Sequence, residues 1–215
     1  MKQQIIVVSH CFLNDAVKLR NQEPAAMEEE RRLKRAFINQ MLSQGIEFLQ
    51  LPCPEFILYG SSRWSHASSQ FDNPHFRKEA RKMLEPVVMQ LEEYNAHPDR
   101  YEILGILGID GSPSCGVNYT FDGNWGGEFS DGPSLKNTLD SLKKVPEPGI
   151  FMDTLKEMLH EKHLPVKLYS LDTFTTRIEP SSAADASELD LSLSGHKGHQ
   201  KPAFSDEAPG GLHIL

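Results

Sequence analysis

The segment ILGILGIDGSPSCG, residues 103–116, contains the features from which the rest of the fold can be predicted. Its first half is an apolar run of Ile, Leu and Gly, which is typical of a β-strand buried on both faces of a parallel sheet. From Asp110 onward it is rich in turn-forming residues and ends close to Cys115. We therefore expect a buried strand over residues 101–109 that presents a thiol just beyond its carboxyl end.

The same arrangement occurs twice more along the chain. IIVVSHC runs from Ile5 to Cys11, and FLQLPCPE contains Cys53. In open parallel sheets ligands bind outside the carboxyl ends of the strands. Neighbouring strands lie about 5 Å apart, so three adjacent strands would bring the three thiols within reach of one another.

Helical and strand-like patterns alternate in the rest of the chain. Apolar residues at helical spacing predict three helices, at 25–43, 75–95 and 150–162, and Pro86 is expected to kink or divide the second. Further strands are expected at 5–9, 47–51 and 164–171. Polar loops are expected at 11–24 and 55–73, and a hairpin turn is expected at Asp122-Gly123. This order predicts a three-layer α/β/α fold with a mostly parallel, Rossmann-like sheet of about four to five strands.

Composition predicts the domain organisation and the environment. Residues 1–179 are expected to form a single α/β domain, and residues 180–215, poor in apolar side chains, a flexible tail. A net charge of −8 argues against general nucleic-acid binding. The chain has no apolar run of the roughly 20 residues that span a membrane. The amino terminus is not typical of a signal peptide, and three cysteines without a CxxC pair do not form a secreted disulfide framework. We therefore expect a cytoplasmic protein.

Three converging thiolates indicate a soft-metal site. An iron–sulfur cluster and a zinc ion are both candidates, and His10 or His66 is a candidate fourth ligand of a Cys₃His zinc site. Three cysteines without a fourth ligand would leave one iron of a [4Fe–4S] cluster open to substrate. The alternative is that the cysteines are small buried hydrophobic residues, as free cysteines often are.

The motifs SHCFLN, LPCPE and GSPSCG, the last followed by YTFDGNWGGEF, resemble the cysteine motifs of the 2-thiouracil desulfidase family over about residues 5–135. The resemblance implies a [4Fe–4S] cluster bound by Cys11, Cys53 and Cys115, whose open iron takes the sulfur of a thiolated nucleobase. The implied reaction replaces C=S by C=O without redox change and releases sulfide. The first motif departs from the family, because FLNDAVKLR stands where an Arg-Tyr-Asp-Gly run is usual.

The resemblance also implies that Glu55 and Ser112 act in proton transfer and substrate positioning. A carboxylate is the usual group to take a proton from an attacking water, and Ser114 is an equal candidate for the functional hydroxyl. The alternatives are a surface glutamate at a helix start and a Ser-Pro turn. Two other functions stay open: a non-catalytic zinc or iron–sulfur module, and an enzyme with Cys115 as nucleophile, activated by His10 or His66.

Removal of the carboxyl-terminal segment tests the domain prediction. Truncation after Glu179 should leave the melting temperature and the metal content nearly unchanged, because a segment with so few apolar residues cannot supply a core. Thermal unfolding followed by circular dichroism would measure this. A large drop in melting temperature would show that the segment packs on the domain.

Overall fold

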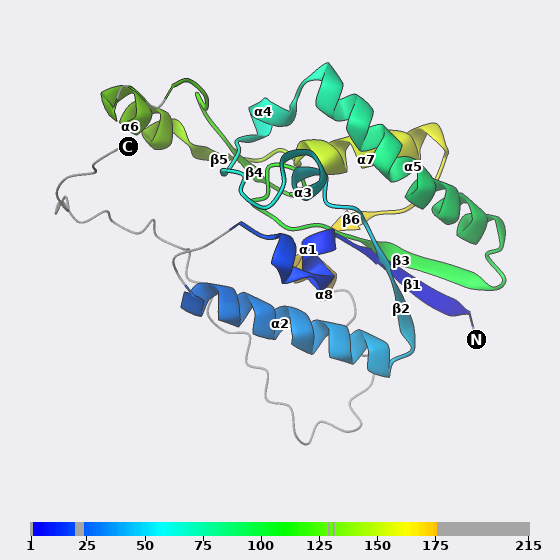
Figure 1. The fold of residues 1–215 in the computed structure, drawn as a ribbon. Helices are drawn as coiled ribbons and strands as arrows, with labels where there is room; N and C mark the ends of the chain where they lie inside the picture. Colours follow the sequence, from blue (N-terminus) through cyan, green and yellow to red (C-terminus); the bar gives the residue numbers. More distant parts are fainter. Residues whose placement is uncertain (1, 20–23, 129, 131, 176–215) are drawn as a thin grey trace. The chain divides into compact units, whose positions relative to one another are not determined.

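Figure 1 shows the computed structural model, which describes residues 2–19, 24–128, 130 and 132–175. The chain divides into two units, Met1–Glu179 and Pro180–Leu215, and all described residues belong to the first. The predicted tail over residues 180–215 therefore lies outside the described residues.

A four-stranded parallel sheet forms the centre of the domain. Its strands are β1 (Gln3–Val8), β2 (Ile46–Gln50), β3 (Tyr101–Leu107) and β6 (Leu168–Tyr169), in the order β2-β1-β3-β6. All three pairings are parallel, which confirms the predicted α/β fold. The last strand is much shorter than predicted, because Leu164 still closes the preceding helix (its N–H donates to the Leu159 oxygen, 2.9 Å) and Pro165 has no N–H.

Helices cover both faces of this sheet (Figure 1). Helix α2 (Pro24–Ser43) and the short α8 (Leu171–Thr175) pack on one face, and α5 (Pro74–Ala96) and α7 (Ile150–Glu161) pack on the other. Successive side chains of a strand point to opposite faces, so β1 contributes Val7 to one core and Ile6 and Val8 to the other. These buried faces account for the continuous apolar run IIVV.

The sequence predicts that Pro86 kinks or divides helix α5. The helix is continuous across Pro86, so it is not divided there, and a kink stays a prediction. Pro86 is exposed, whereas Leu84 and Val87 on either side of it are buried in the core. A proline in a helix leaves the carbonyl four residues earlier without its usual partner. That carbonyl belongs to Lys82, a residue on the exposed side of α5, where water can bind it.

The two predicted polar loops contain short helices instead. Residues 11–24 include α1 (His10–Leu13) and the 3₁₀-helix η1 (Asp15–Val17), and residues 55–73 include α3 (Pro54–Tyr59) and α4 (Ser68–Phe71). Helices of so few residues show no recognisable apolar period, so the pattern did not reveal them.

The predicted hairpin turn at Asp122-Gly123 is also wrong. Strand β4 (Thr120–Asp122) pairs with β5 (Lys143–Val145), and helix α6 (Gly132–Ser141) lies between them in the sequence. A Cβ on Gly123 would lie 2.7 Å from the Ser141 carbonyl oxygen. The glycine therefore permits a close approach of two chain segments and does not mark a two-residue turn.

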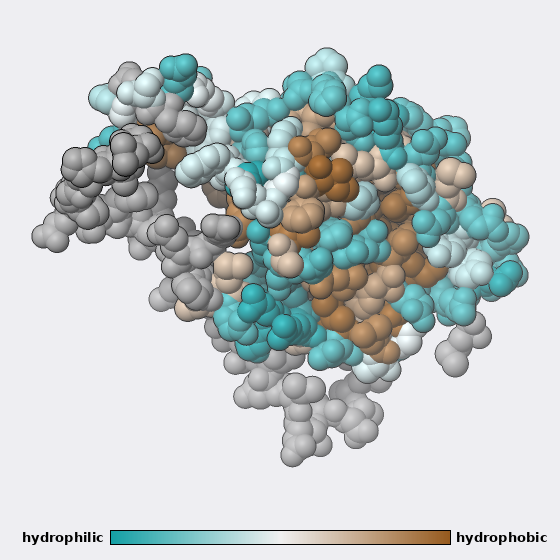
Figure 2. Space-filling view, in the orientation of Figure 1, coloured by the Kyte–Doolittle hydropathy of each residue, from teal (hydrophilic) through white to brown (hydrophobic). Residues whose placement is uncertain are grey.

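The visible surface is hydrophilic over much of α2 and α5, and hydrophobic side chains gather over β2 and α3 (Figure 2). Phe56, Ile57 and Tyr59 of α3 are among the exposed large apolar residues. Within the described residues, no helix is long and apolar enough to cross a membrane.

Two substitutions in α5 test the assignment of the core. Leu84 is fully buried, whereas Met89 on the same helix is 62% exposed. Leu84→Ala should lower the free energy of unfolding by about 2–5 kcal/mol, because it leaves a cavity. Met89→Ala should change it by less than about 0.5 kcal/mol. Urea unfolding would measure both, and equal effects would contradict the packing of α5.

Candidate functional site

The three cysteines lie at the carboxyl edge of three adjacent strands. Cys11 belongs to α1 directly after β1, Cys53 caps α3 after β2, and Cys115 lies in the loop after β3. Because β1 pairs with both β2 and β3, the topology brings the three loops together. A thiolate at Cys11 or Cys53 would raise the pKa of Cys115, and a thiolate at Cys53 would raise that of Cys11, so the three side chains lie within electrostatic range of one another.

Burial dominates the electrostatics of these thiols. It raises the pKa of Cys11 to about 11, and it raises the pKa of Cys53 as well. Burial also raises the pKa of Cys115 well above its usual value, and the negative charge of Cys11 adds to this effect. At neutral pH the free thiols are therefore protonated, and a bound cation would be needed to stabilise them as thiolates.

Within the part of the chain that the structure describes, no group of three or more His, Cys, Asp or Glu side chains is arranged to hold a metal ion. The metal centre expected from the sequence stays a prediction.

The loop that carries Cys115 is held by the amino terminus of α7. The Ser114 carbonyl accepts hydrogen bonds from the N–H groups of Phe151 (3.0 Å) and Met152 (3.1 Å). A Cβ on Gly149 would lie 2.5 Å from the Ser114 carbonyl carbon, so only glycine allows this approach without a backbone shift. The helix thus uses its unpaired N–H groups to fix the backbone beside the thiol.

All three predicted acid/base and positioning residues lie in one hydrogen-bonded network with Cys115, here called the Glu55 network. The Ser114 hydroxyl donates to Oε1 of Glu55 at 2.6 Å and lies 3.5 Å from the Cys115 sulfur. The Ser112 hydroxyl lies 3.3 Å from that of Ser114 and accepts from the Cys115 N–H at 3.0 Å. Glu55 does begin a helix, but it is only 8% exposed and is not a surface glutamate.

Arg63 is a member of this network that the sequence reasoning missed. Its Nε donates to Oε2 of Glu55 at 3.2 Å, and the side chain of Arg63 is only 5% exposed. The other guanidinium nitrogens donate to the carbonyls of Gly60 (3.0 Å) and Val17 (2.8 Å). The sequence does contain one feature that could have indicated Arg63. It is the one basic residue among the charged positions of residues 55–73.

The two histidines named as candidate ligands have other surroundings. The His66 ring packs against both Tyr59 and Phe71, with 4.8 Å between ring centroids in each case, and those two rings also stack on each other at 5.8 Å. Burial lowers the pKa of His66, and its Nδ1 has no hydrogen-bond partner among the described residues. His10 Nε2 lies 3.5 Å from the side-chain nitrogen of Asn14. None of these contacts involves a cysteine.

Substitution of Gly149 tests how the Cys115 loop is held. Gly149→Ala should displace the backbone at Ser114 and lower the free energy of unfolding by about 1–3 kcal/mol, as overpacking does. The amide resonances of residues 112–116 should shift in an NMR spectrum. Gly132→Ala is the control, because a Cβ there meets no atom within 4 Å. Unchanged resonances in Gly149→Ala would contradict the close approach.

One known protein is similar to this chain over about half of its length. The chain is 29% identical over 115 residues to the uncharacterized protein MJ0003 of Methanocaldococcus jannaschii, and the match covers 54% of this chain and 69% of that protein. No family model matches the chain, and no solved structure matches it. The similarity assigns no activity, so the resemblance to the 2-thiouracil desulfidase family stays a prediction.

Proposed function

We propose that this protein is an iron–sulfur-dependent desulfidase that replaces C=S by C=O in a thiolated nucleobase or a similar small molecule. The observation that carries the proposal is the contact between the buried Glu55 carboxylate and Ser114. The Ser114 hydroxyl donates a hydrogen bond to this carboxylate at 2.6 Å and lies 3.5 Å from the Cys115 sulfur. Cys115 is buried and Cys11 and Cys53 are partly exposed, so the carboxylate would supply a proton acceptor next to three candidate soft metal ligands.

Cys11, Cys53 and Cys115 would hold the cluster. Their placement fits it, because all three cysteines follow adjacent strands at one edge of the sheet. Since the pKa of each thiol is raised, the thiols would need a cationic partner to ionise. When bound by three cysteines, the cluster supplies an open iron that attracts a soft thiocarbonyl sulfur.

The residues of the Glu55 network would handle the proton. The overall reaction is R₂C=S + H₂O → R₂C=O + H₂S, in which a C–O bond forms and the C–S bond breaks with no change of oxidation state. Glu55 takes one proton from the attacking water and delivers it to the sulfur. The second water proton leaves the hydroxyl of the tetrahedral intermediate as C=O forms, and Glu55 passes it to the departing sulfur, so that both protons leave as H₂S. Ser114 and Arg63 each bond one carboxylate oxygen and so fix its orientation. Each oxygen retains a second lone pair for the water proton.

The structure gives less support to a cysteine nucleophile. Cys115 is 6% exposed, and the pKa of its thiol is raised by burial. Its side-chain neighbour is the Ser114 hydroxyl, whereas an activated cysteine is usually paired with a histidine.

Metal analysis after anaerobic purification tests the proposal directly. About four irons and four sulfides per chain would support the desulfidase, since that is the composition of a [4Fe–4S] cluster. One zinc per chain would favour a non-catalytic metal module. A metal-free protein in which Cys115 is readily alkylated would favour the thiol enzyme.

The ligand assignment gives a first prediction. Cys11→Ser, Cys53→Ser and Cys115→Ser should each lose the brown chromophore and the desulfidase activity together, because three thiolates are needed to hold the cluster. Far-ultraviolet circular dichroism would verify that each variant is folded. A variant with wild-type iron content would show that the substituted cysteine is not a ligand.

The proposed role of Glu55 gives a second prediction. Glu55→Gln keeps the shape and removes the base, so turnover of 2-thiouracil should fall by about 10²–10⁴-fold, the usual contribution of general acid–base catalysis. Iron content should stay at the wild-type level. Glu47→Gln is a matched control, since Glu47 is exposed on β2.

Three results would contradict the role of Glu55 as the base. Full turnover in Glu55→Gln would move the proton transfer to Ser112 or Ser114. Loss of iron in Glu55→Gln would make Glu55 a structural residue. An equal loss of turnover in Glu47→Gln would show that the effect is not specific to the network.

A further inference from the structure

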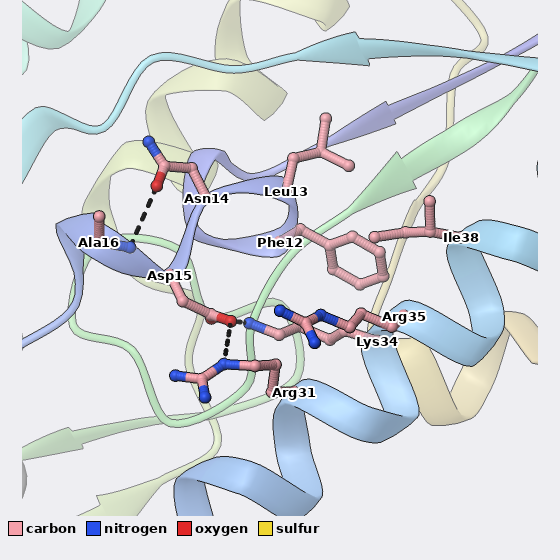
Figure 3. Close-up of a pocket in the computed structure, with 9 residues that line it drawn as sticks. All are labelled: Phe12, Leu13, Asn14, Asp15, Ala16, Arg31, Lys34, Arg35 and Ile38. Atoms are coloured by element: carbon pink, nitrogen blue, oxygen red, sulfur yellow. Dashed lines mark hydrogen bonds and ion pairs between the residues drawn. The ribbon is translucent and has the colours of Figure 1, made fainter.

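A cavity lies between the α1–η1 segment and helix α2, with a volume of about 430 Å³. This volume falls within the roughly 300–1,000 Å³ of small-molecule sites. Figure 3 shows three cationic side chains, those of Arg31, Lys34 and Arg35, that extend from α2 toward the α1–η1 segment. Apolar side chains form another part of the wall, contributed by Phe12, Leu13 and Ile38.

Two of the three cations are already neutralised. The side chain of Lys34 is 3% exposed, and its ammonium group bonds the Cys11 carbonyl (2.9 Å) and the Asp15 carboxylate. Arg31 donates to the other oxygen of Asp15 at 3.3 Å and also pairs with Glu28. Glu30 lies 3.6 Å from the Lys34 ammonium. Both oxygens of Asp15 are therefore occupied, and Lys34 and Arg31 each have an acidic partner.

Arg35 differs from them. It is exposed, and it has no acidic partner among the residues that the structure describes. Its guanidinium therefore contributes one uncompensated positive charge to a cavity that also has an apolar wall. Leu13, on that wall, is 40% exposed and is free to be covered by a ligand.

We propose that this cavity binds a small organic acid, with one carboxylate on Arg35 and an apolar body against Phe12, Leu13 and Ile38. A guanidinium pairs with a carboxylate through two parallel hydrogen bonds. A single charge is favoured because only one cation of the cavity is uncompensated, and phosphate has no apolar body to place on the apolar wall. No residue of the Glu55 network lines this cavity, and the proposal does not rest on the proposed desulfidase.

Binding of benzoate to the full chain tests this inference. Ligand-observed NMR and calorimetry should give a dissociation constant in the roughly millimolar range or tighter. Benzyl alcohol, which has the same ring but no charge, should bind at least about tenfold more weakly, since it lacks the charge-assisted hydrogen bonds. Inorganic phosphate should also bind more weakly than benzoate.

Variants on α2 and α1 locate the site. Arg35→Gln should weaken benzoate binding by about tenfold or more, because it removes the charged partner. Leu13→Ser should weaken benzoate and benzyl alcohol alike. Arg32→Gln is the matched control, since Arg32 is 57% exposed on the same helix and pairs with Glu29 outside the cavity. The Arg32→Gln variant should bind benzoate with unchanged affinity.

Several outcomes would overturn the proposal. No binding of benzoate, or tighter binding of phosphate than of benzoate, would exclude an apolar monocarboxylate. Full affinity in Arg35→Gln would exclude the assigned partner. An equal loss in Arg32→Gln and Arg35→Gln would show a general attraction to the basic helix and no defined site.

Discussion

Hydrogen bonds between the carboxyl ends of the neighbouring strands β1, β2 and β3 hold the segments of the candidate site in register. The Leu51 N–H donates to the Val8 carbonyl at 2.8 Å, and the Ser9 N–H donates to the Leu107 carbonyl at 2.9 Å. The buried Ser9 hydroxyl adds a bond to the same carbonyl at 3.1 Å. These bonds continue the ladder one residue beyond β1 and one residue beyond β2. Each cysteine-bearing segment therefore leaves the sheet from a fixed point beside its neighbours.

The polar groups at this edge are tolerated because they satisfy one another. A buried carboxylate without a partner would cost several kcal/mol, whereas Glu55 has both a hydroxyl and a guanidinium partner. Arg63 in turn bonds two backbone carbonyls, so its charge is also well solvated by the protein. Such a network orients its members, because each side chain is held by more than one bond.

The sequence was most informative where the pattern was long. Helices α2 and α5 and the buried strands β1 and β3 follow from sustained periodicity or from continuous apolar runs. The convergence of the three cysteines followed from the topology, since parallel neighbours share one carboxyl edge. Arg63 could not be predicted in the same way, because its partners Glu55, Gly60 and Val17 are brought to it only by the folded loops.

The contact between the Cys115 loop and α7 has a consequence for biosynthesis. The groups that fix the Ser114 carbonyl belong to Phe151 and Met152, well over thirty residues after the last cysteine. A nascent chain that has just exposed Cys11, Cys53, Cys115 and Glu55 still lacks the helix end that holds the loop. The three thiols therefore reach their final arrangement only after α7 has left the ribosome, and any metal held by all three of them would be taken up after that point.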